Sequence, residues 1–158
     1  MGNKQDVLKE GVFTDWTSIL GRELNTWYEH IRSPLVKPSG TDVNRVFSND
    51  KISVSFKEAT GECKNETLHV ECDGKRDGVL CIKENKTTEL ILYHDDSYSI
   101  LILGNPERTA LSYYSTQKNL SAIQLDYAMK LTKAVGLTFQ YSASVLNRLF
   151  STNQPHVF

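Results

Sequence analysis

Long apolar runs are missing from this sequence. No stretch approaches the roughly 20 consecutive apolar residues that a membrane-spanning helix needs, so we expect no transmembrane segment. The first residues, MGNKQDVLKE, lack the apolar centre of a signal peptide. If the protein is exported, we expect its signal to have been removed from this sequence.

An excess of charge of either sign is missing too. The 18 basic and 19 acidic residues leave a formal net charge of -1 at pH 7. This balance gives no electrostatic reason to expect nucleic acid or an anionic membrane as a partner. The partners that remain are small molecules and other proteins, including further copies of this chain in a homo-oligomer.

Cysteine is scarce. Cys63, Cys72 and Cys81 are too few for a disulfide scaffold, and none has a histidine or cysteine at the spacing of a zinc site. Cys72 and Cys81 flank a predicted hairpin turn, DGKRDG, and could pair across it. One disulfide and separate small thiols both stay open.

The common catalytic motifs are absent. The sequence has no phosphate-binding glycine loop, no G-x-S-x-G and no H-E-x-x-H. His94, Asp95 and Asp96 are metal-binding residue types, but they fall in a predicted hairpin turn, where acidic side chains form local hydrogen bonds. We therefore expect a solvated turn there, and neither a metal nor a cofactor.

What the sequence does have is the alternation of β-strands. In the segment 51–58, Ile52, Val54 and Phe56 alternate with polar residues, the pattern of a sheet with one dry face. Turn signals separate eight candidate strands, at 24–32, 43–48, 51–58, 65–72, 78–85, 89–94, 97–103 and 109–115. Short links in sequential order predict one all-β domain over 1–158, whose barrel, over about 24–116, is eight-stranded, antiparallel and up-and-down.

The candidate strand 97–103 is apolar on both sides. Alternate residues share a side: Tyr98, Ile100 and Ile102 point one way, and Ser99, Leu101 and Leu103 the other. We expect one side to line the barrel and the other to be covered by a helix.

The covering helix is predicted at 121–135. Ser121 and Gln124 form a capping box, Leu120 and Leu125 are spaced as a hydrophobic staple, and Gly136 is placed to end the helix. Residues at helical spacing give one apolar stripe: Leu120, Ile123, Tyr127, Leu131, Ala134 and Val135. A short helix over about 13–20 and a final strand at about Leu146–Ser151 complete the expected elements.

Three segments carry a resemblance to a known family. NTWYEHIR at 25–32 is similar to a first-strand G-x-W-Y-E-x-x-R pattern, and HDDSYSILILGNPER at 94–108 to D-x-x-Y followed by an apolar strand and G-N-P-x-R. The third is the order of closing strand, capped helix and VLNRLFSTNQ. The chain thereby resembles the lipocalin family, in the branch of apolipoprotein D and the bacterial outer-membrane lipocalins.

Two positions depart from that pattern. Asn25 replaces the glycine before Trp27, and Thr116 stands where the family has the arginine that caps the tryptophan ring. The sequence leaves open whether Arg148 or Lys118 substitutes for that cation.

The resemblance implies a calyx that holds one small hydrophobic ligand, such as a fatty acid, lysolipid, sterol-like molecule or pigment. Alternation and the family pattern place Trp27 and Glu29 near the closed base. If it is buried there, the Glu29 carboxylate must be hydrogen-bonded or neutralised. Its alternative role is that of a structural latch to the N-terminal segment. Candidates for the binding wall are Val54, Phe56, Val70, Ile91, Tyr93, Leu101, Ser112 and Tyr114. Glu89, Tyr93, Ser112 and Tyr114 are expected to supply polar contacts to the ligand.

The expected activity is therefore non-enzymatic lipid binding, with transport or scavenging of the ligand by a secreted protein. Isomerase-type lipocalins use a calyx cysteine on an early strand, and none precedes Cys63 here; Cys72 has no histidine or lysine evidently placed to activate it. Sequons at Asn65, Asn85 and Asn119 favour export. The alternative is an interaction protein whose barrel is filled by its own side chains and which acts through its rim loops.

Overall fold

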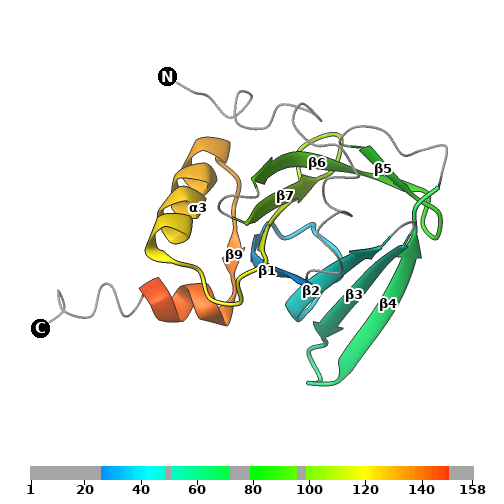
Figure 1. Ribbon diagram of the computed structural model, residues 1–158, viewed down its shortest axis with the longest axis horizontal. Coiled ribbons are helices and arrows are strands. Elements are labelled where there is room, and N and C mark those ends of the chain that lie inside the picture. Colours follow the sequence, from blue (N-terminus) through cyan, green and yellow to red (C-terminus); the bar gives the residue numbers. More distant parts are fainter. Residues whose placement is uncertain (1–25, 49–50, 72–78, 96–98, 150–158) are drawn as a thin grey trace, which may run out of the picture.

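The computed structural model describes residues 26–48, 51–71, 79–95 and 99–149, and these form a barrel with a helix on its outside (Figure 1). The barrel strands are β1 (Thr26–Arg32), β2 (Thr41–Ser48), β3 (Lys51–Lys57), β4 (Cys63–His69), β5 (Val79–Ile82), β6 (Thr87–Asp95), β7 (Ile100–Gly104) and β8 (Leu111–Ser115). All eight lie within or next to the segments that alternation predicted. The hairpin of β3 and β4 extends beyond the rest of the barrel (Figure 1).

The strands pair in the order β4-β3-β2-β1-β8-β7-β6-β5, every pair antiparallel. A single bridge between Val70 and Ile82, flanked by backbone bonds from Glu71 to Cys81 and from Lys83 to His69, nearly closes β4 onto β5. The predicted eight-stranded up-and-down barrel is confirmed.

Two β-bulges change which side chains point inward. The pairing of β1 with β8 shifts between Glu29 and Ile31, and that of β6 with β7 shifts between Ile91 and Tyr93. Beyond a bulge the alternation of faces restarts one residue late. Simple alternation along 24–32 predicts Ile31 on the same side as Trp27 and Glu29, and this prediction is wrong, because the bulge places Ile31 in the outer core.

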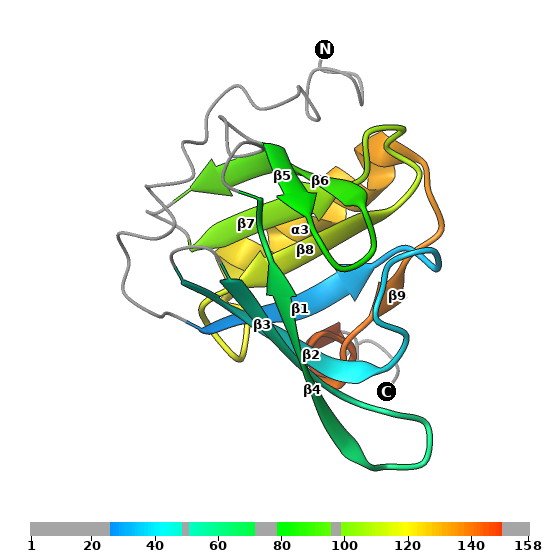
Figure 2. The same ribbon diagram turned by 90° about the vertical axis from the view of Figure 1, so that its right-hand side faces the viewer.

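The apolar side chains form two separate cores on the two faces of β7. Leu101 and Leu103 belong to an inner core with Trp27, Val54 and Tyr114, inside the barrel. Ile100 and Ile102 belong to an outer core with the helix α3 (Ala122–Val135). Figure 2 shows α3 behind β7 and β8, so the strand that is apolar on both sides has one side inside the barrel and the other under the helix, as predicted.

The local signals of α3 are confirmed. The Ser121 side chain accepts a hydrogen bond from the backbone of Gln124, whose side chain bonds back to Ser121, and Gly136 ends the helix at φ 75°. The expected stripe is wrong at Ile123, which is 66% exposed. The buried face instead consists of Leu125, Ala128, Leu131 and Val135 together with Gln124.

The C-terminal segment differs from the prediction. A strand was expected at about Leu146–Ser151, but a helix covers 143–149 and the short strand β9 (Gln140–Tyr141) pairs with β1 before it. Ser142 starts the helix, because its hydroxyl accepts from Val145 N at 3.2 Å. The helix expected over about 13–20 lies outside the described residues. Within the described ranges no helix is long and apolar enough to cross a bilayer.

We expect the buried side chain of His30 to make the stability of this fold depend on pH. Its side chain is 2% exposed, with Nε2 donating to the Gln117 carbonyl at 2.8 Å. Burial lowers the pKa of His30 below 6.5, against a smaller opposing effect of that hydrogen bond. Because the unfolded chain binds the proton more tightly, the contribution of neutral His30 is present above pH 6.5 and is lost as the pH falls below it. We expect the melting temperature to fall more steeply between pH 7 and 5 in the wild type than in His30→Gln; equal slopes would contradict this.

Gly104 ends β7 where no side chain fits. A Cβ there would lie 2.6 Å from Leu111 Cδ2 and 2.8 Å from Leu92 Cδ1. Gly104→Ala should therefore cost about 1–3 kcal/mol of unfolding free energy, measured by urea denaturation. Adding Leu111→Val to Gly104→Ala should recover part of that loss, and additive losses would show that the clash is not the cause.

Candidate functional site

The barrel contains a cavity of about 540 Å³ at one end. Its mouth is framed by the β1–β2 loop (35–39), the β5–β6 turn at Asn85 and the β7–β8 turn at Asn105 and Ala110. The walls come from seven strands and carry apolar side chains and polar groups together: Arg45, Val54, Phe56, Glu66, Leu68, Ile82, Thr87, Thr88, Glu89, Leu103 and Ser112. A cavity of this size and composition suits one small amphipathic molecule.

The cavity contains a buried ion pair. Arg45 is 3% exposed and donates from Nη1 to Glu89 Oε1 at 2.7 Å, and its guanidinium carbon lies 5.5 Å from the centre of the Tyr114 ring. Burial alone would lower the pKa of Arg45, but Glu89, helped by Tyr114 and Glu29, outweighs it and raises the pKa above its usual value. Arg45 is therefore a permanent cation inside the barrel.

Sequence reasoning singled out Glu89 and missed Arg45. The signal was available, because Val43, Arg45 and Phe47 alternate on one face of β2 and all three are buried. An arginine between two inward hydrophobic residues of a barrel strand has no position except the interior. Its partner could not be read from the sequence, since Glu89 is 44 residues away.

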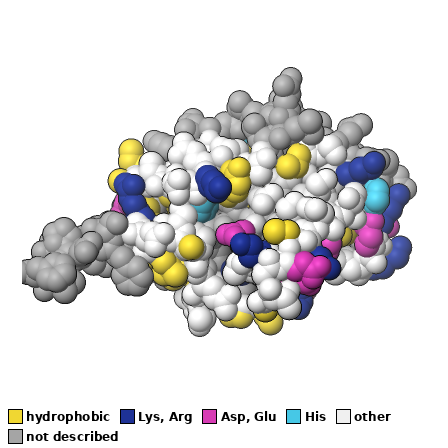
Figure 3. All heavy atoms as spheres, turned by 90° about the horizontal axis from the view of Figure 1, so that it is seen from below, with side chains coloured by type: hydrophobic (Ala, Val, Ile, Leu, Met, Phe, Trp, Pro, Cys, Tyr) yellow, Lys and Arg dark blue, Asp and Glu magenta, His cyan; other side chains and the backbone are white. Residues whose placement is uncertain are grey.

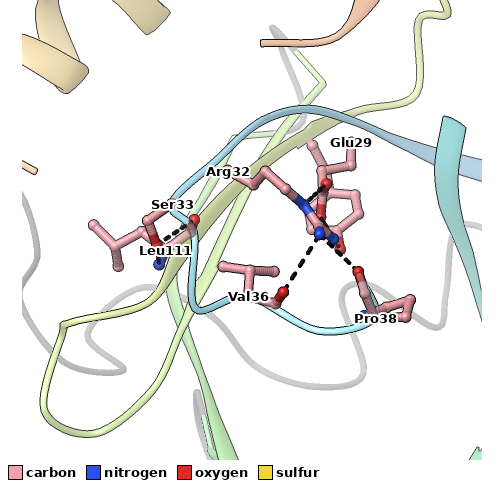
Figure 4. A network of polar contacts seen from close by, with 7 residues as sticks. Glu29, Arg32, Ser33, Val36, Pro38 and Leu111 are labelled. Atoms are coloured by element: carbon pink, nitrogen blue, oxygen red, sulfur yellow. Dashed lines mark hydrogen bonds and ion pairs between the residues drawn. The ribbon is translucent and has the colours of Figure 1, made fainter. Parts of the chain in front are cut away.

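A second ion pair fixes the loop at the mouth (Figure 4). Arg32 forms hydrogen bonds with both carboxylate oxygens of Glu29 and donates to the carbonyls of Val36, at 3.3 Å, and Pro38, at 2.6 Å. Burial raises the pKa of Tyr114, so its hydroxyl stays protonated and donates to Glu29 Oε2 at 3.1 Å. The partner that a buried Glu29 was expected to need is thus Arg32, and through it Glu29 holds the β1–β2 loop.

Nine of the ten predicted site residues lie on the inner side of the barrel. Val54, Phe56 and Ser112 line the cavity. Trp27, Val70, Ile91, Leu101 and Tyr114 belong to the inner core and do not line the cavity, and Glu29 joins Tyr114 to Arg32. The cavity thus occupies one end of the barrel, and packed side chains fill the rest.

The expectation that Tyr93 lines the wall is wrong. The bulge after Ile91 turns Tyr93 to the outer core, where its ring stacks on Tyr127 of α3 with centroids 5.8 Å apart. The same bulge turns His94 toward Trp27, with the rings T-shaped at 5.8 Å. His94 lies in β6 and not in the expected turn, and Asp96 lies outside the described residues.

Trp27 has two described neighbours inside the barrel where the family's arginine is missing. The His94 ring packs edge-on against the indole, and Arg45 is the cross-strand neighbour of Trp27 on β2. Lys118 and Arg148, the cations considered from the sequence, are both exposed. The guanidinium of Arg45 lies over the Tyr114 ring, so the ring contact of Trp27 is with His94.

The described ranges also contain thiols and side chains of the metal-ligating types. Cys63 and Cys81 are free thiols there, and Cys72 lies outside them. No group of three or more histidine, cysteine, aspartate or glutamate side chains is placed to hold a metal ion in the part of the chain that the structure describes. The barrel cavity is therefore the candidate functional site.

Comparisons with known proteins identify the fold. No protein-family model and no curated protein matches the chain. Among solved structures, the siderocalin Ex-FABP, described as having dual ligand specificities, matches at 16% identity and a TM-score of 0.55, over 77% of this chain and 89% of its own. Apocrustacyanin C2 matches at 14% identity and a TM-score of 0.52, over 80% of this chain and 83% of its own. At these identities the likeness concerns the fold alone, and with the eight-stranded barrel and its outer helix it shows that the chain has the lipocalin fold.

Proposed function

We propose that this protein binds one small hydrophobic ligand in the barrel cavity and acts as its carrier or scavenger. The observation that carries the proposal is the cavity of about 540 Å³, open at the end framed by the loops. Val54, Phe56, Leu68, Ile82 and Leu103 give it an apolar wall. Burying apolar ligand surface against such a wall supplies about 25 cal/mol per Å² before the entropic cost of binding.

The similar structures support a binding role. The siderocalin is described by its dual ligand specificities. Extending a binding role from it to this chain is an analogy between folds. We further propose a non-enzymatic activity and an extracellular location, without a specific ligand. All three sequon asparagines, Asn65, Asn85 and Asn119, are exposed, as acceptors of glycans need to be.

The alternative function is that of an interaction protein with a filled barrel. Packed side chains do fill the closed half, where Trp27, Leu101 and Tyr114 are almost fully buried. A barrel filled by its own side chains would not contain the cavity at the other end. We therefore favour ligand binding.

Native mass spectrometry of freshly purified protein tests the proposal. We expect a mass shift from one co-purifying small molecule, removed by organic extraction and restored by adding a lipid extract. Val54→Trp should abolish the shift by filling the cavity. Ser53→Trp, on the opposite exposed face of β3, should leave it unchanged.

Two results would contradict the proposal. One is an unmodified mass in every preparation together with no uptake from the extract. The other is a Val54→Trp variant that is folded by circular dichroism and still retains the ligand, because the ligand would then lie outside the cavity.

A further inference from the structure

Arg45 is a buried charged group of the cavity with only part of its donors bonded. Its guanidinium has five N–H donors, and it lies inside the barrel between Val43 and Phe47, opposite Val54. Glu89 accepts from Nη1, whereas the buried Nε has no hydrogen-bond partner. Leaving a buried charged donor unpaired is costly, so acceptor oxygens brought into the cavity are favoured.

The partner of Arg45 leaves room for such an acceptor. Glu89 holds Arg45 by one of its two oxygens, and its side chain is 24% exposed. Arginine presents a planar fork of donors that matches a carboxylate with two parallel hydrogen bonds. A second carboxylate can therefore share the guanidinium or displace Glu89 from it.

The other basic side chain of the cavity lining is a weaker anchor for an anion. Lys37 lies in the loop at the mouth and is exposed. An ion pair at an exposed position is screened by solvent and contributes little. On the face of the outer surface shown in Figure 3, acidic and basic side chains are interspersed.

We propose that the ligand is an amphipathic acid that binds with its carboxylate inward on Arg45 and its apolar tail along Val54, Phe56 and Leu103 toward the mouth. The inference rests on the proposed function and adds the chemical class and the orientation of the ligand. Binding brings the carboxylate to the Arg45 donors and leaves Glu89 free to turn toward solvent, with no covalent step.

Calorimetric titration of the delipidated full chain at pH 7.5 with decanoic acid, 1-decanol and methyl decanoate tests it. We expect the acid to bind about tenfold or more tightly than either neutral compound, as for a hydrogen bond between charged groups. Arg45→Gln should bring the acid down to the affinity of the alcohol. Glu89→Gln should do the reverse and tighten acid binding severalfold, because it removes the competing carboxylate. Lys57→Gln, an exposed cation outside the cavity, is the charge-matched control and should change nothing.

The outcomes separate the two proposals. Equal affinities for acid and alcohol in the wild type would overturn the inference and leave the binding function intact. Loss of the preference in Lys37→Gln, with the preference kept in Arg45→Gln, would place the carboxylate at the mouth and overturn it as well. No binding of any of the three compounds would count against the binding function itself. Because Arg45→Gln leaves Glu89 unpaired, Arg45→Gln/Glu89→Gln provides a second variant if the first does not fold, and it should lose the preference too.

Discussion

Replacing Arg32 by methionine should cost about 3–5 kcal/mol of unfolding free energy, the usual effect of removing one partner of a buried ion pair. The Arg32 and Glu29 side chains are 9% and 5% exposed, so the variant leaves the Glu29 carboxylate buried with only the Tyr114 hydroxyl as a partner. The apolar stem of methionine keeps most of the packing. The loss of unfolding free energy should therefore come from the unpaired charge of Glu29 and not from lost packing. Equilibrium denaturation measures this loss.

Two further variants distinguish the effect of breaking the Glu29–Arg32 ion pair from the effect of changing a lysine or arginine in general. Glu29→Gln/Arg32→Met should be more stable than Arg32→Met alone, since no buried charge is left unpaired. Lys57→Met removes an exposed cation 3.8 Å from Asp42 and should cost less than about 1 kcal/mol. A cost for Arg32→Met as small as that of Lys57→Met would show that the Glu29–Arg32 pair does not stabilise the protein.

The same variant should loosen the mouth of the cavity. Arg32 holds the Val36 and Pro38 carbonyls of the β1–β2 loop, so amide hydrogen exchange of residues 35–37 and 39 should accelerate in Arg32→Met relative to the wild type. Unchanged exchange would mean that the loop is held by its own packing.

Leu101→Ala and Ile102→Ala should each cost about 2–5 kcal/mol, because both side chains are almost fully buried and truncation leaves a cavity. Their effects on the helix should differ. Ile102 packs in the outer core with α3, and Leu101 in the inner core. We expect faster amide exchange in α3 for Ile102→Ala, and not for Leu101→Ala at matched destabilisation.

Leu101→Ala and Ile102→Ala together test whether β7 packs against a separate core on each of its two faces. Accelerated exchange of α3 in both variants to the same extent would mean that the two cores unfold as one unit. Faster exchange only in Leu101→Ala would mean that the register of β7 is inverted.

Local sequence patterns predicted the fold well. Clean alternation in β3, the capping box of α3 and the apolar character of both faces of β7 are properties of short segments, and each appears as expected. The bulges in β1 and β6 depend on pairing with a neighbouring strand, and no local pattern announced them. They account for the misplaced Ile31 and Tyr93.

The candidate site was predictable in part for the same reason. Inward residues of a strand without a bulge, such as Val54 and Phe56 on β3, follow from alternation. Arg45 could have been found in the same way, but a charged residue between two hydrophobic ones is more often read as exposed. How far core packing extends into the barrel depends on all strands together, which is why Leu101 and Tyr114 were expected to line a cavity that ends short of them.

The central claim is that a small hydrophobic ligand lies inside the barrel at its open end. Intermolecular nuclear Overhauser effects between the ligand and methyl-labelled protein test it most directly, with decanoic acid or 1-decanol as the probe, whichever binds more tightly. We predict contacts from the ligand methylenes to the methyl groups of Val54, Ile82 and Leu103, which line the cavity. Contacts to Ile102 and Leu131 of the outer core instead, or none at all with a saturated complex, would contradict the account.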